Sequence, residues 1–140
     1  MTYDTSMMRA SDHERDGSDR HVVRAVAAVL ALIAASLALV SILHLTGLVG
    51  GRAAPFDSEH AGIAEASIGA VLASGSIILL RGARRPRAIG LTVTVFAIAG
   101  FIVGLTITAQ GGHLPDIAYH VAILPVLVGS LVVLVRAPRP

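Results

Sequence analysis

The 140-residue sequence contains no cysteine and no tryptophan, and only 14% of its residues are charged. The absence of cysteine excludes disulfide scaffolds, thiol redox chemistry and cysteine-based metal sites. Soluble globular domains carry roughly 25% charged residues, so this charged fraction is unusually low. The scarcity of aromatic residues (4%) also argues against the stacking surfaces that single-stranded nucleic acids need. The composition therefore excludes an ordinary soluble domain and a nucleic-acid-binding protein.

Long apolar runs are what the sequence does contain. Three segments of 27, 28 and 19 residues have no charged side chain, and they cover residues 25–51, 88–115 and 117–135. A fourth apolar segment is interrupted only by Glu65. About 20 apolar residues in a helix cross a hydrocarbon core of ~30 Å. The sequence thus predicts an all-α, polytopic membrane protein with a four-transmembrane-helix bundle over residues 22–136, and with spans at about 25–48, 61–80, 88–109 and 116–135.

Arginine placement predicts the orientation of these spans in the plasma membrane. Ten of the 11 basic residues precede the first span, join the second to the third, or follow the fourth, whereas Arg52 alone lies on the opposite side. Because basic loops stay in the cytoplasm, both termini are expected to be cytoplasmic, including a short tail over residues 137–140. The arginines would then meet anionic lipid of the bilayer. The absence of lysine and the abundance of alanine, arginine, valine and glycine are typical of high-GC bacteria.

The N-terminal segment differs in character from the rest of the chain. Residues 1–21 are polar and rich in acidic and basic side chains, so they are predicted to form a disordered cytoplasmic tail. A docking peptide is the alternative interpretation. The first apolar run is too long for the core of a signal peptide and is interpreted as an uncleaved anchor.

Small residues recur at helical spacing in two spans. The second span carries Gly62, Ala66, Ala70 and Ser74, and the third carries a Gly-x3-Gly pattern over residues 100–104. Such ridges allow close approach of helices in a membrane. They are predicted to pack the four helices together. The alternatives are a seam between copies in a homo-oligomer and a docking face in a larger membrane complex.

A weak internal repeat relates the second span to the fourth. A shift of 55 residues superimposes their apolar patterns and terminal arginines, and it places Glu65 opposite His120. A parallel repeat of this kind occurs in some transporters. The alternative is that any two apolar spans ending in arginine align this well. Duplication would put Glu65 and His120 at similar depths.

Polar side chains gather at the predicted outer face, and they are the candidates for chemistry. They are His44, Asp57, Glu59, His60, Glu65, His113, Asp116 and His120. Glu65 lies within a span, where an ionised group costs several kcal/mol unless it pairs, faces the bundle or takes up a proton. Glu65 and His120 are accordingly the candidate proton relay.

The same region offers a candidate metal site. Asp116 and His120 are four residues apart and so share a helix face. A carboxylate and an imidazole in this arrangement could ligate zinc or copper together, or the aspartate could fix the tautomer of the histidine. His44, His60 and Glu65 complete the candidate set of metal ligands.

Each of these residues also has a purely structural interpretation. His44, His60 and His113 would then be polar residues at the membrane interface, and Asp57 and Glu59 would be solvated loop acids. Asp116 follows Pro115 and suits the first turn of a helix, where the dipole favours a carboxylate. Glu65 and His120 would form an interhelical hydrogen bond or ion pair that fixes helix packing.

Three functional hypotheses remain open. The leading one is a non-enzymatic accessory or interaction subunit in the membrane. The second is a metal- or haem-binding protein with its site at the outer face. The third is a proton-linked small transporter or channel that works as a homo-oligomer. No catalytic residue is predicted, because the sequence has neither a Gly-x-Ser-x-Gly element nor a phosphate-binding loop.

Overall fold

The computed structural model describes residues 5–54 and 56–137, and for residues 5–20 it describes the backbone alone. Over those ranges the chain is entirely helical, with α1 (Thr5–Leu45), α2 (Ser58–Leu80), α3 (Pro86–Gly111) and α4 (Leu114–Arg136). All four helices are long and apolar enough to cross a membrane, α1 over its segment His21–Leu45. The predicted all-α fold with four candidate spans is confirmed, and each predicted span agrees to within a few residues with the membrane-length apolar segment of its helix.

Local sequence explains where the helices begin and end. Pro86 occupies the first position of α3, where its missing N–H removes no helical hydrogen bond. Gly47 and Gly82 follow the ends of α1 and α2 with φ angles of 71° and 79°, which favour glycine over residues with a side chain. Pro125 lies inside α4, and the helix continues through it.

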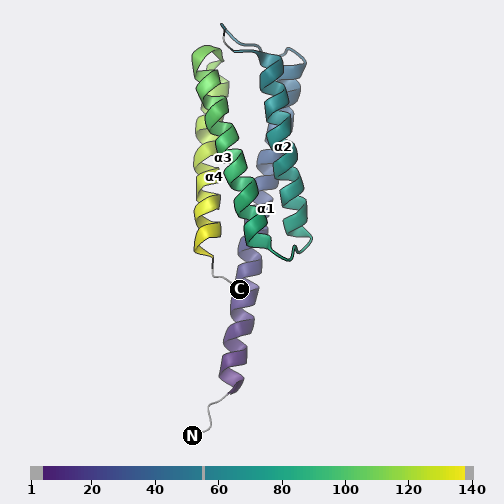
Figure 1. The fold of residues 1–140 in the computed structure, drawn as a ribbon, viewed down its shortest axis with the longest axis vertical. Helices are drawn as coiled ribbons and strands as arrows, with labels where there is room; N and C mark the ends of the chain where they lie inside the picture. Colours follow the sequence, from purple (N-terminus) through teal and green to yellow (C-terminus); the bar gives the residue numbers. More distant parts are fainter. Residues whose placement is uncertain (1–4, 55, 138–140) are drawn as a thin grey trace.

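Helix α1 begins much earlier than its apolar segment. It starts at Thr5, so residues 5–21 are helical, in contrast to the predicted disordered tail; residues 1–4 of that tail lie outside the described residues. This part of α1 projects beyond the bundle (Figure 1). Adding residues to an existing helix avoids the unfavourable nucleation step, so a stable apolar helix can extend into a polar segment.

The helices form an up-and-down bundle. Helix α1 packs chiefly against α2, α3 packs chiefly against α4, and α2 also contacts α3. The α1–α2 and α3–α4 connections lie at one end, opposite the start of α1 and the end of α4 (Figure 1). This end is called the distal end below. The interior is filled by apolar side chains that include Leu30, Leu37, Leu72, Phe101, Leu127 and Leu134. Many large apolar residues also face outward, as is typical of helices that are apolar enough to cross a membrane.

Glycines on α2 and α3 set the close contacts between helices. A Cβ atom at Gly69 would lie 3.3 Å from Leu37 Cβ on α1, and one at Gly75 would lie 2.7 Å from Val93 Cγ1 on α3. The predicted Gly-x3-Gly pattern of the third span does pack inside the bundle, with Gly100 against Ile68 and Gly104 against His120.

The predicted ridge on the second span is only partly internal. Gly62 is buried, but Ala66, Ala70 and Ser74 are exposed on the outside of α2. The prediction of internal packing is therefore wrong for these three residues. The buried face of α2 instead follows Gly62, Gly69 and Ser76, whose seven-residue spacing returns to the same side every two turns.

Candidate functional site

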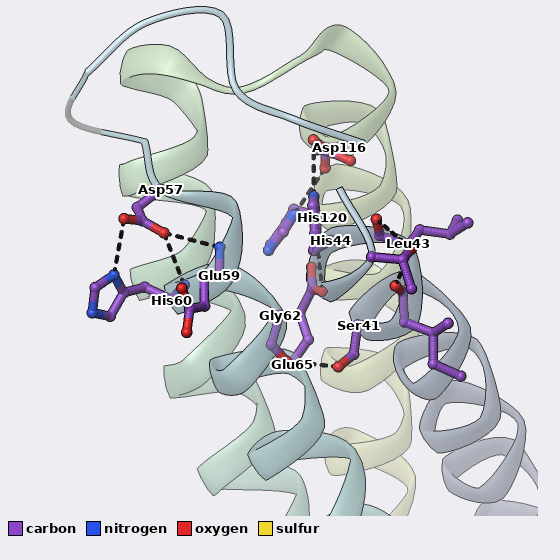
Figure 2. Close-up of polar contacts among 12 residues, drawn as sticks. Ser41, Leu43, His44, Asp57, Glu59, His60, Gly62, Glu65, Asp116 and His120 are labelled. Carbon is purple, nitrogen blue, oxygen red and sulfur yellow. Dashed lines mark hydrogen bonds and ion pairs between the residues drawn. The ribbon is translucent and has the colours of Figure 1, made fainter. Parts of the chain in front are cut away.

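Three helices bring four ionisable side chains close together near the distal end. His44 comes from the last turn of α1, Glu65 from α2, and Asp116 and His120 from the first two turns of α4. Their exposed fractions are 2%, 5%, 7% and 7%, in that order. Figure 2 shows the four side chains converging between the helices. We refer to His44, Glu65, Asp116 and His120 as the buried cluster.

His44 is the bridge of the buried cluster. Its Nδ1 lies 2.8 Å from Glu65 Oε2, and its Nε2 lies 3.5 Å from Asp116 Oδ2 (Figure 2). One imidazole thus stands between carboxylates from two other helices. A protonated His44 would donate Nδ1–H to Glu65 and would balance one negative charge, whereas two carboxylates are present.

Helix ends explain part of this placement. Asp116 lies in the first turn of α4 and His44 in the last turn of α1. The helix dipole favours negative charge at the first position and positive charge at the second. The prediction that Asp116 occupies a helical first turn is confirmed, and its additional contact with His44 was not predicted.

The His120 ring hydrogen-bonds to neither the Asp116 carboxylate nor Glu65, the two partners that the sequence suggested for it. Its Nδ1–H donates to the backbone carbonyl of Asp116 at 2.8 Å, while the Asp116 carboxylate turns to His44. Likewise, Glu65 bonds to His44 and not to His120. The absence of a side chain at Gly104 makes room for the His120 ring, because a Cβ there would lie 2.6 Å from Nε2. Phe101 packs on the same ring, with 5.2 Å between centroids.

The α1–α2 connection covers the buried cluster. The backbone N–H groups of Arg52 and Ala53 donate to the carbonyl of Gly111 at 2.8 and 3.2 Å, which ties the connection to the end of α3. Phe56 from this connection lies against His44, with ring centroids 5.8 Å apart. Sequence reasoning missed Phe56, because nothing in the pattern of apolar runs indicates which helix a loop residue will contact.

Further hydrogen bonds join the helices deeper in the bundle. Ser41 donates to the carbonyl of Gly62 at 2.7 Å and so links α1 to α2. Ser36 donates to its own helix at Ile33, which leaves its oxygen to accept from Tyr119 of α4 at 2.7 Å. These two contacts hold α1 against α2 and α4, the other two helices that contribute to the buried cluster.

The remaining candidates of the sequence lie apart from the buried cluster. The His60 side chain is 84% exposed, and its Nδ1 lies 3.2 Å from Asp57 Oδ2. Figure 2 shows this pair to one side of the buried cluster. Asp57 caps α2 by accepting from the backbone N–H groups of Glu59 and His60. The hydrogen bond from the backbone N–H of His60 is the main reason that the pKa of Asp57 lies below its ordinary value. Glu59 is exposed and His113 is half-buried before α4.

A pocket adjoins the buried cluster. Its volume is about 370 Å³, and it lies at the distal end between α1, the start of the α1–α2 connection and the beginning of α4. Its walls are mostly apolar and are formed by Val40, Leu43, Leu48 and Val49. Gly50 and Pro115 also line it. The polar contributions come from His113, Asp116 and Tyr119.

Four of the five candidate metal ligands lie in the buried cluster, but they are not arranged as a metal site. In the part of the chain that the structure describes, no three histidine, aspartate or glutamate side chains form a group that could hold a metal ion. The geometry gives the reason, because the two nitrogens of His44 face different carboxylates. His60, another member of the predicted set, lies outside the cluster.

Comparison with known proteins gives no further assignment. No protein-family model matches the chain, and neither a curated protein nor a solved structure is significantly similar to it.

Proposed function

We propose that the protein is a proton-linked small transporter or channel of the plasma membrane, in which the buried cluster binds and passes protons. One observation carries this proposal, namely the buried His44 that stands between Glu65 and Asp116. A proton can leave one nitrogen of an imidazole as another arrives at the second nitrogen, so His44 can pass protons between the two carboxylates. The relay expected from sequence, Glu65 with His120, is thereby revised to Glu65, His44 and Asp116.

Energetic reasoning supports a functional role for this arrangement. Apolar residues of similar volume usually pack at lower cost than a buried ion pair, so stability alone does not require these charges. Ionisable residues inside membrane spans commonly mark proton or ion pathways. The arginine distribution supports cytoplasmic termini, and the distal end with its buried cluster would then face the outside.

The experiment is proton flux into proteoliposomes that contain a pH-sensitive dye. A pH gradient is imposed, with and without a pooled set of small cations, anions and neutral metabolites on the outside. Wild-type protein should dissipate the gradient at least several-fold faster than empty liposomes in one of these conditions. Glu65→Gln removes the charge that pairs with His44 and should return the rate to that of empty liposomes.

Glu59→Gln is the matched control, because it makes the same chemical change at an exposed residue of the same helix end. This variant should keep the wild-type rate. Equal rates for wild-type protein and empty liposomes, or an unchanged rate in Glu65→Gln, would contradict the proposal.

A non-enzymatic accessory subunit is the second candidate. It is supported by the outward-facing Ala66, Ala70 and Ser74 on α2, which offer a small-residue surface to another membrane helix. That helix could belong to a second copy or to a larger complex. Under this hypothesis the purified chain carries no proton flux, and the buried cluster serves to fix the helices.

A further inference from the structure

The pocket at the distal end has the dimensions of a ligand site. Its volume of about 370 Å³ lies in the range of roughly 300–1,000 Å³ that small-molecule sites occupy. Residues from α1, the α1–α2 connection and α4 all contribute to it, so its shape depends on the folded bundle. Such sites are mostly apolar with a few polar groups, as here.

Asp116 gives this pocket a defined polarity. Its side chain is 9% exposed, and its Oδ2 makes no hydrogen bond to any described residue. The one group that could supply a positive charge within 4 Å among the described residues is His44, whose Nε2 lies 3.5 Å from Asp116 Oδ2. The other ring nitrogen of His44 already bonds to Glu65. Asp116 is also one of the residues that line the pocket, and a buried carboxylate that has an oxygen without a donor favours a positively charged partner.

The other lining residues suit a cation with an apolar body. The pocket lining contains no arginine, and its one basic side chain is that of His113, which precedes α4. Tyr119 also lines the pocket, and aromatic faces attract ammonium groups. The walls formed by Val40, Leu43, Leu48 and Val49 can cover hydrocarbon.

We propose that this pocket binds a small organic cation, an ammonium group on an apolar body, with Asp116 as its counter-ion. The inference rests on the proposed proton-linked function and names the class of substrate for it. A cation at Asp116 and a proton on His44 compete for the same carboxylate. Binding of one therefore weakens binding of the other, which is the coupling that an exchanger of protons for cations needs.

All charged groups near Asp116 enter this competition. They are His44 of α1, Glu65 of α2 through His44, Arg52 of the α1–α2 connection, and His113 and His120 of α4. Helix α3 contributes no ionisable side chain at the distal end, since its one arginine, Arg87, lies at the opposite end. Arg52 donates to the carbonyl of Gly112 and is exposed.

The test is calorimetric titration of the full chain in a nonionic detergent free of phospholipid. The probe is benzyltrimethylammonium, and benzyl alcohol serves as the uncharged comparison. Wild-type protein should bind the cation saturably and should not bind the alcohol. Asp116→Asn should weaken cation binding at least tenfold, because the counter-ion is lost. Val49→Trp should also abolish binding by filling the pocket while it leaves the carboxylate in place.

Glu59→Gln is again the control, because it removes a negative charge at the distal end outside the pocket, and it should bind like wild type. Thermal unfolding of each variant shows whether it is folded. Absence of saturable binding to folded wild-type protein, or binding that survives both pocket substitutions, would overturn the proposal.

Lipid composition separates a free cation from a lipid headgroup. Binding of the probe should persist in nanodiscs of phosphatidylglycerol and in nanodiscs of phosphatidylcholine. Loss of binding in phosphatidylcholine alone would mean that a choline headgroup occupies the pocket, and it would overturn the assignment to a free cation. Proton flux without cation binding would refute this inference alone, whereas cation binding without flux would refute the proposed transport function.

Discussion

At the scale of single residues, two buried carboxylates share His44. Glu65 and Asp116 are both buried, and in the described structure each lies within ion-pair distance of this imidazole. His60 is a contrasting case at the same end of the bundle, since it pairs with Asp57 in an exposed position. Both histidines are candidate metal ligands in the sequence. Removal of His44 would leave two buried carboxylates without a partner, whereas removal of His60 would leave only an exposed one.

Replacement of His44 by leucine should destabilise the protein strongly. The substitution leaves Glu65 and Asp116 buried without a partner, and breaking a buried pair in this way lowers the free energy of unfolding by about 3 kcal/mol or more. His60→Leu should change it by no more than about 0.5 kcal/mol, as is usual for exposed residues. Denaturant titration in detergent, followed by circular dichroism, measures both values. Similar losses for the two variants would show that His44 has no special role.

At the scale of helices, close approach depends on which glycines face a neighbour. Gly75 faces the branched side chain of Val93, with a Cβ at that position only 2.7 Å from Val93 Cγ1. Gly129 on α4 faces open space, with nothing within 4 Å of a Cβ. Glycine is therefore needed for close helix packing at Gly75, whereas a side chain would fit at Gly129.

Alanine substitutions should reveal this difference as a change of sign. Gly75→Ala should lower the free energy of unfolding by about 1–3 kcal/mol, because Val93 is stiff and the helices must separate. Gly129→Ala should raise it by up to about 1 kcal/mol through better helix propensity. The two variants are compared by the same denaturant titration. Stabilisation by Gly75→Ala would contradict the packing of α2 against α3.

For the bundle as a whole, the orientation in the membrane decides what the buried cluster can reach. The predicted cytoplasmic termini would place the α1–α2 connection, the pocket and the buried cluster toward the outside. Protons and cations would then enter from that side, and the apolar interior around Leu30 and Leu134 would separate the cluster from the cytoplasm.

Single cysteines can test this orientation cleanly, because the chain has none of its own. In intact cells, a membrane-impermeant maleimide should label Glu59→Cys, which lies at the distal end. Ala137→Cys, which follows α4, should be labelled only after the membrane is permeabilised. Both should react fully in detergent, which serves as the accessibility control. The reverse labelling pattern would place the buried cluster near the cytoplasm.

Hydropathy and residue order are enough to predict that this chain forms four apolar helices and that its ionisable residues gather at one end. Hydropathy is a property of each segment, so the spans follow from composition within about 20 residues. Because each span reverses direction, the depths of His44, Glu65, Asp116 and His120 also follow from their positions along the chain. The amino-acid sequence alone therefore predicts that these four residues lie at similar depths.

The pairing of those residues, in contrast, depends on how the helices pack. The rotation of each helix about its axis depends on contacts between residues far apart in the sequence, such as Gly69 with Leu37 and Gly75 with Val93. Because of this rotation, Ala66, Ala70 and Ser74 face outward. Glu65 lies against His44, and His60 remains exposed. The cover provided by Phe56 depends likewise on a loop that is held by the end of α3. Local sequence fixes depth along a helix, whereas packing between helices fixes the direction in which each side chain points.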